Sequence, residues 1–192
     1  MGSSSLSDMI EKMDIKEAIE KRRAYRSLEP VEINEELAKD LAECAGLAPS
    51  CFNNQPWRFV FVHGDKLKDL HQALSKGNQW AERASMIIAV CSKKEDDCVM
   101  KDGRAYYLFD TGMANGFLIL RATELGLVTH PIAGYDPQKV KEALDIPEEM
   151  TVITLVIVGK HSGLNPVLSE KQRKDEVERP KRLKFEEFAH IE

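Results

Sequence analysis

The chain has 192 residues and a net charge of −5, with 43% hydrophobic and 31% charged residues. This length and balance predict one globular domain with a core of its own. The acidic balance argues against a nucleic-acid or anionic-membrane partner, because either would need a concentrated basic face. No apolar run approaches the roughly 20 residues of a membrane span, so we expect a soluble protein.

The N-terminal part predicts a tail, a short helix and a group of cations. Residues 1–13 resemble a disordered tail, and Asp14 is suited to cap an amphipathic helix that ends near Lys21. Arg22, Arg23 and Arg26 follow directly. The ordinary explanation is a solvated helix end, favoured by the negative pole of the helix dipole. The alternative is a phosphate site, because guanidinium groups form bidentate bonds with phosphate oxygens.

A second helix is predicted from Asn34 to about Leu47, with Asn34 as its cap and glutamates in its first turn. It leads into residues 48–57, a loop dense in amides and hydroxyls. Such loops carry function more often than packing. Prolines and asparagines also make ordinary turns, so the residue types alone leave both interpretations open.

Strands and helices alternate in the middle of the chain. Alternation over 57–63 and a continuous apolar run over 86–91 predict two strands. Residues 65–83 between them are expected to be mostly helical, with a break near Gly77 and Asn78. Residues 104–125 have helical length and are apolar on nearly every side, which predicts burial in a core or between subunits.

The last third predicts a further helix and the central strand. Asp136 and Pro137 are typical of a helix start, and the helix should end by Leu144. Residues 151–158 are apolar and rich in β-branched side chains, so this strand should be central in its sheet. The fold class is therefore α+β: a three-layer α/β/α sandwich whose mixed, mainly antiparallel sheet has about four or five strands flanked by helices.

The cysteines show no metal-binding or catalytic spacing. Cys44, Cys51, Cys91 and Cys98 include no Cys-x-x-Cys pair and have no histidines at ligand spacing. We therefore expect four free thiols in a cytoplasmic protein, with no metal site. Gly-x-Gly-x-x-Gly and Walker-type phosphate loops are also absent from the sequence.

Three segments together resemble the FMN-dependent nitroreductase family. They are the arginines at 22–26, the loop at 49–57 with the pattern Pro-Ser-x-x-Asn-x-Gln-Pro-Trp, and Gly-Leu-Val-Thr-His-Pro-Ile-Ala-Gly-Tyr-Asp at 126–136. The similarity runs from about Asp14 to His190. It implies one FMN-binding domain over 14–192, with an extension at 161–192 that wraps over the body or over a partner subunit.

The resemblance also implies which residues contact the cofactor. Guanidinium groups would hold the FMN phosphate, amides and hydroxyls would meet the pyrimidine edge of the flavin, and a backbone turn would approach flavin N5. Ala24 stands where relatives commonly have a serine. The phosphate set is Arg22, Arg23, Ala24, Arg26 and Arg182; the flavin-edge set is Ser50, Asn53, Gln55 and Asn78; the turn is Ile132, Ala133 and Gly134. None of these residues is assigned as catalytic, because the cofactor performs the hydride chemistry itself.

The activity implied is transfer of a hydride from NADH or NADPH to FMN, followed by reduction of a small-molecule acceptor such as a nitroaromatic or a quinone in a ping-pong mechanism. The resemblance also implies a homodimer in which both chains bind each flavin, with the helix at 104–125 in the interface. The short segment 92–103 implies a short lid over an accessible pocket. Two alternatives remain: a flavin-binding or storage protein with little turnover, and a flavin enzyme of different reaction such as reductive dehalogenation.

Overall fold

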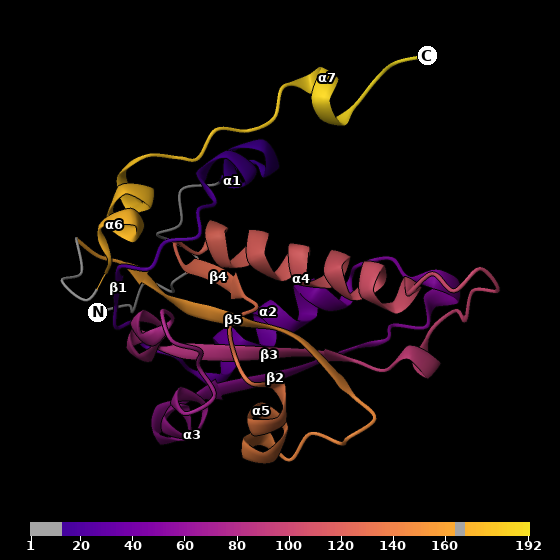
Figure 1. Cartoon of the computed structure of the whole chain (residues 1–192), viewed down its shortest axis with the longest axis horizontal. Coiled ribbons are helices and arrows are strands. Elements are labelled where there is room, and N and C mark those ends of the chain that lie inside the picture. Colours follow the sequence, from indigo (N-terminus) through magenta and orange to yellow (C-terminus); the bar gives the residue numbers. More distant parts are fainter. Residues whose placement is uncertain (1–12, 164–167) are drawn as a thin grey trace, which may run out of the picture.

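A computed structural model describes residues 13–163 and 168–192. The predicted disordered tail, apart from Met13, lies outside the described residues. Five strands form one sheet, and each of their pairings is antiparallel. Helices cover both faces of this sheet (Figure 1), so the predicted α+β sandwich is confirmed.

The sheet is organised around β5 (Thr151–His161), as predicted for its central strand. β3 (Met86–Ser92) pairs with β5 on one side and with β2 (Trp57–His63) on the other. β4 (Val128–Ile132) and the short β1 (Leu28–Glu29) also pair with β5. Every residue of β3 is buried, which explains why its sequence is continuously apolar rather than alternating.

Two helical layers bury the two faces of the sheet. α2 (Glu35–Gly46) and α4 (Tyr106–Glu124) pack together over one face, and α1 (Ile15–Lys21) lies against α4. α3 (Leu67–His71) and α5 (Pro137–Leu144) lie on the opposite face (Figure 1). Successive side chains of a strand point to opposite faces, so alternate residues of β3 belong to two separate core clusters.

One helical expectation was only partly right. Residues 65–83 contain a five-residue α3 and a short 3-10 turn, η4 (Gln79–Arg83), rather than a mostly helical segment. α4 buries one side only, because it lies on the outer layer of the sandwich. Its side chains Leu108, Phe109 and Phe117 remain 39%, 56% and 42% exposed.

The two helices of the C-terminal segment differ in their contact with the body of the domain. α6 (Glu170–Val177) contacts the body of the domain, whereas α7 (Phe185–Phe188) and the residues around it extend away from the body (Figure 1). Phe185 and Phe188 are 49% and 68% exposed. Within the described residues, none of the helices combines the length and apolar character needed to cross a membrane.

The prediction of four free thiols is wrong for two cysteines. Cys51 and Cys98 form a disulfide across 47 residues of sequence, while Cys44 and Cys91 are free. The antiparallel register of β2 and β3 pairs Trp57 with Ser92. Cys51 lies six residues before the start of β2 and Cys98 six residues after the end of β3, so the pairing brings the two flanking loops together. Spacing in sequence alone does not reveal such a meeting.

Candidate functional site

A basic cavity of about 310 Å³ lies where the chain leaves α1. The structure brings together all five residues of the predicted phosphate set and adds three more. The lining residues are Arg22, Arg23, Ala24, Arg26, Asp175, Arg179, Pro180 and Arg182. Arg182 is distant in sequence from the other predicted residues, so this convergence is a property of the fold.

The cavity has an excess of positive charge. Burial, and then the charges of Arg179, Arg182 and Arg23, lower the pKa of Arg22. The guanidinium groups therefore lie close enough to repel one another. A bound dianion such as a phosphate monoester would relieve this repulsion, and planar guanidinium groups suit its oxygens. The residues present fit the phosphate end of FMN.

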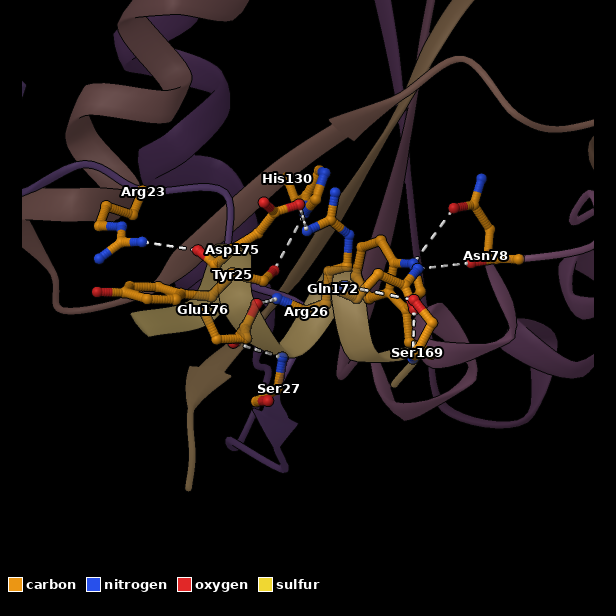
Figure 2. Close-up of polar contacts among 12 residues, drawn as sticks. Arg23, Tyr25, Arg26, Ser27, Asn78, His130, Ser169, Gln172, Asp175 and Glu176 are labelled. Carbon is orange, nitrogen blue, oxygen red and sulfur yellow. Dashed lines mark hydrogen bonds and ion pairs between the residues drawn. The ribbon is translucent and has the colours of Figure 1, made fainter. Parts of the chain in front are cut away.

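α6 holds the arginine segment in place (Figure 2). The buried carboxylate of Glu176 accepts hydrogen bonds from the backbone N–H of Arg26 at 2.7 Å and of Ser27 at 3.1 Å. Arg23 donates to the carbonyl of Asp175 at 2.8 Å, and the Arg26 guanidinium lies 3.6 Å from the Asp175 carboxylate. Sequence reasoning missed both acidic residues, because about 150 positions separate them from their partners.

Arg179 is a further cation that the sequence analysis missed. Its guanidinium donates to the carbonyl oxygens of Glu20 and Arg22, the latter at 3.1 Å. It thereby links the segment after α6 to the end of α1. The basic run Arg179-Pro180-Lys181-Arg182 was a signal that could have identified it.

His130 supports the same segment from β4. Its Nδ1 lies 3.1 Å from the carbonyl oxygen of Tyr25, and its ring packs against Trp80 with centroids 4.7 Å apart. Burial lowers the pKa of His130 to about 4 from an ordinary value of 6.5. His130 is therefore neutral near pH 7 and donates its Nδ1 proton to Tyr25.

Stability should depend on pH through His130. As pH falls below 6.5, His130 takes up a proton in the unfolded chain, but in the folded chain it stays neutral until about pH 4. The free energy of unfolding therefore falls between pH 6.5 and pH 4. The expected loss reaches about 3 kcal/mol, the scale of such a shift. Urea unfolding at pH 7 and pH 4.5 measures it. His130→Gln should reduce the difference in unfolding free energy between the two pH values, and the exposed His63→Gln should not. The same difference in the parent protein and in both variants would contradict this role of His130.

Asn78 and Gly134, which the resemblance assigns to the flavin edge and to the turn near N5, contact each other. Asn78 Nδ2 donates to the carbonyl of Gly134 at 2.9 Å, and Asn78 Oδ1 accepts from the indole of Trp80 at 3.2 Å. A Cβ atom on residue 134 would lie 2.4 Å from Asn78 Nδ2. The need for glycine in this chain therefore comes from the approach of Asn78. Ile132 is buried at the end of β4, and Ala133 is exposed beside it.

The loop at 49–57 is held in an unusual backbone conformation. Phe52, Asn53 and Gln55 have φ angles of 49°, 58° and 50°, in the left-handed region that favours glycine. Ser50 Oγ accepts from the N–H of Gln55 at 3.0 Å, and Gln55 Nε2 donates to the carbonyl of Asn53 at 3.4 Å. Strained backbone of this kind clusters at functional sites. The exposed Asn53 side chain remains open to a ligand.

Within one chain, this loop and the basic cavity lie apart. The N–H of Cys51 contacts Asp110 near the start of α4, whereas α1, which leads into the cavity, packs beside Phe117 and Leu120 farther along α4 (Figure 1). Asp110 and Leu120 are ten residues apart on α4, about 15 Å at 1.5 Å per residue. The structure therefore brings Asn78 and Gly134 into contact, but it does not unite Ser50, Asn53 and Gln55 with the arginines.

The profile of the nitroreductase family matches residues 19–98 and 71–160, which together cover most of the chain. The solved structure of an oxidoreductase containing FMN superposes with a TM-score of 0.79 at 27% identity, over 99% of this chain and 96% of its own. A nitroreductase family protein from Clostridium novyi NT is 31% identical with a TM-score of 0.72, over 79% and 87% of the two chains. The chain belongs to the nitroreductase family, a family of oxidoreductases.

Curated relatives carry names that differ in the electron donor. An NADH dehydrogenase of Thermus thermophilus is 26% identical over 177 residues, which cover 77% of this chain and 86% of the relative. An oxygen-insensitive NADPH nitroreductase of Helicobacter pylori is 27% identical over 175 residues, covering 73% and 82%. These names agree on a nicotinamide donor and disagree on which one.

Proposed function

We propose that this protein binds FMN, accepts a hydride from NADH or NADPH and passes electrons to a nitroaromatic, a quinone or a similar small acceptor by a ping-pong mechanism, in the cytoplasm. The observation that carries the proposal is the cavity that five arginines line together with Ala24. FMN, when bound, supplies the hydride and electron chemistry. The chain supplies binding and orientation: arginines for the phosphate, and amides and backbone groups for the ring.

The purified protein is expected to carry non-covalent FMN and to be yellow. On denaturation it should release FMN rather than FAD or riboflavin, because the cavity matches a terminal phosphate. Anaerobic addition of NADH or NADPH should bleach the flavin, and a nitroaromatic or quinone should restore its colour. A colourless protein that gains no flavin spectrum with FMN would disprove the proposal. A bound flavin that neither NADH nor NADPH bleaches would favour the alternative of a flavin-storage protein.

We also propose a homodimer, because the basic cavity and the loop at 49–57, which together make up the expected FMN site, lie apart within a single chain. A second copy can place its loop at 49–57 beside the basic cavity of the first. Exposed apolar side chains on α1 and α4, including Ile15, Ile19, Phe109 and Phe117, provide a surface for it, and the segment around α7 can lie on the partner. Obligate interfaces commonly bury more than about 2,000 Å².

Sedimentation at low micromolar concentration tests the dimer. The flavin-loaded protein should sediment as one species of twice the 21.7 kDa chain mass. Phe109→Glu, which puts a charge on the exposed face of α4, should lower both the dimer fraction and the FMN content. A 21.7 kDa species that still oxidises NADH or NADPH would contradict a site shared between chains.

A further inference from the structure

The disulfide of Cys51 and Cys98 has acidic neighbours that the flavin chemistry does not use. It joins η2 (Cys51–Asn53) to the segment that follows η5 (Lys94–Asp96). A carboxylate oxygen of Asp97 and both sulfur atoms lie within 4.8 Å of one another. Both cysteines are partly exposed, so a small thiol in solution can reach the bond.

Asp97 and Asp110 are buried beside this bond with unsatisfied oxygens. They are 7% and 1% exposed. Asp110 Oδ2 accepts from the N–H of Cys51 at 2.7 Å. Among the described residues, Asp110 Oδ1 and Asp97 Oδ2 are buried without a hydrogen-bond partner. Burial, and then the neighbouring Asp97, raise the pKa of Asp110, which favours the protonated form of this carboxyl group.

Asn54 distinguishes the two sulfur atoms. Its Nδ2 donates to Asp97 Oδ1 at 3.3 Å and lies 3.7 Å from Cys98 Sγ. An amide donor next to a sulfur stabilises a thiolate on it, which makes that sulfur the better leaving group. The environment therefore favours attack on Cys51 and departure of Cys98.

We propose that Cys51 and Cys98 form a redox-active dithiol/disulfide site that exchanges electrons with soluble thiols of the glutathione class, with the paired carboxyl groups of Asp97 and Asp110 supplying a proton. One thiolate attacks Cys51 Sγ, the disulfide bond breaks, and Cys98 Sγ leaves and takes the proton. A second thiol then attacks the mixed disulfide and releases Cys51 as a thiol. Overall, two thiols become one external disulfide, and the protein disulfide becomes two thiols.

The buried pair Asp97 and Asp110 distinguishes this site from a disulfide with a structural role alone. A cross-link that only stabilises the fold needs no proton donor, and unsatisfied buried carboxyl groups beside it would carry a cost without a benefit. In thiol-rich compartments, protein disulfides are usually transient and redox-active. The proposal requires no flavin, so it and the proposed flavin activity can fail separately.

A thiol titration of the full chain tests the proposal. The protein is equilibrated in buffers with increasing ratios of reduced to oxidised glutathione, quenched with acid, labelled with iodoacetamide in denaturant and read by mass spectrometry. Cys44 and Cys91 are free and provide an internal standard of full labelling. Cys51 and Cys98 should gain label together, and lose it again when oxidised glutathione is restored, while circular dichroism stays native.

Reduction of the pair only where the fold is lost would overturn the proposal, because it would indicate a structural disulfide. Isolation of the protein with both cysteines as thiolates around one Zn²⁺, released only by a chelator, would also overturn it. In that case the two sulfurs and Asp97 would be metal ligands. Both results can be read from the unmodified protein and do not depend on any variant folding.

The rate of disulfide reduction by glutathione tests whether Asp97 and Asp110 supply the proton. Asp97→Asn should slow the reduction of the disulfide by glutathione by at least about tenfold, the lower range for loss of a general acid. Asp96→Asn is the matched control, since Asp96 is the adjacent residue and pairs with Arg58 at 3.6 Å. Asp110→Asn keeps an acceptor for the Cys51 N–H and should slow reduction as well. Equal rates in the three variants and the parent would overturn the role of the acids.

Discussion

Arg22→Ala and Arg26→Ala are each expected to weaken FMN binding by about 1.5 to 3 kcal/mol, the usual scale for a hydrogen bond to a charged group. Both residues line the basic cavity. Riboflavin lacks the phosphate, so its binding should hardly change. Fluorescence titration of the apoprotein with both ligands measures the two affinities.

Lys21→Ala is the control for these variants, because Lys21 pairs with Glu17 at 2.6 Å on the surface of α1. Arg22 offers a second criterion. Burial, and then its neighbouring cations, lower the pKa of Arg22, so Arg22→Ala should leave the apoprotein as stable as before or more stable while FMN affinity falls. Equal losses for FMN and riboflavin would show that the arginines support the fold instead of the phosphate.

Glu176→Ala is expected to lower the free energy of unfolding by about 3 kcal/mol and to weaken FMN binding without touching the cofactor. The buried carboxylate holds two backbone N–H groups of the arginine segment at 2.7 and 3.1 Å. Its removal leaves both donors without an acceptor, at roughly 1 to 3 kcal/mol each. Urea unfolding and FMN titration measure the two effects.

The matched control is Glu178→Ala, two positions along at the exposed end of the same helix. A surface change of this kind should stay within about 0.5 kcal/mol. If Glu176→Ala destabilises the protein while FMN affinity stays at the parental value, Glu176 supports the fold alone and does not position the arginines.

Much of the fold could be predicted because its signals are local. Asp14, Asn34 and Asp136 were assigned as helix caps from residue type, and each accepts hydrogen bonds from the first turn of its helix. β3 and β5 were recognised because strands buried on both faces must be apolar throughout. The region at 65–83 was predicted poorly, since its apolar side chains pack from short 3-10 turns as well as from a helix.

Four of the arginines that line the basic cavity were also grouped together before the structure was known. Arg22, Arg23 and Arg26 are close together in the chain, and the family resemblance added Arg182, which lines the same cavity. Local sequence could not show what supports them. Glu176 reaches Arg26 across 150 positions, and no periodicity connects the two.

The sequence by itself determined the helix caps, the central strands and the cations, because each depends on residues within one or two turns of each other. Only the tertiary structure decided the rest. The pairing of Trp57 with Ser92 brings Cys51 to Cys98, and the packing of α6 turns Glu176 toward Arg26. The loop at 49–57 and the segment that leads into the cavity contact different turns of α4. These contacts depend on how whole elements pack, and side chains far apart in sequence meet only after the sheet has set the register of its strands.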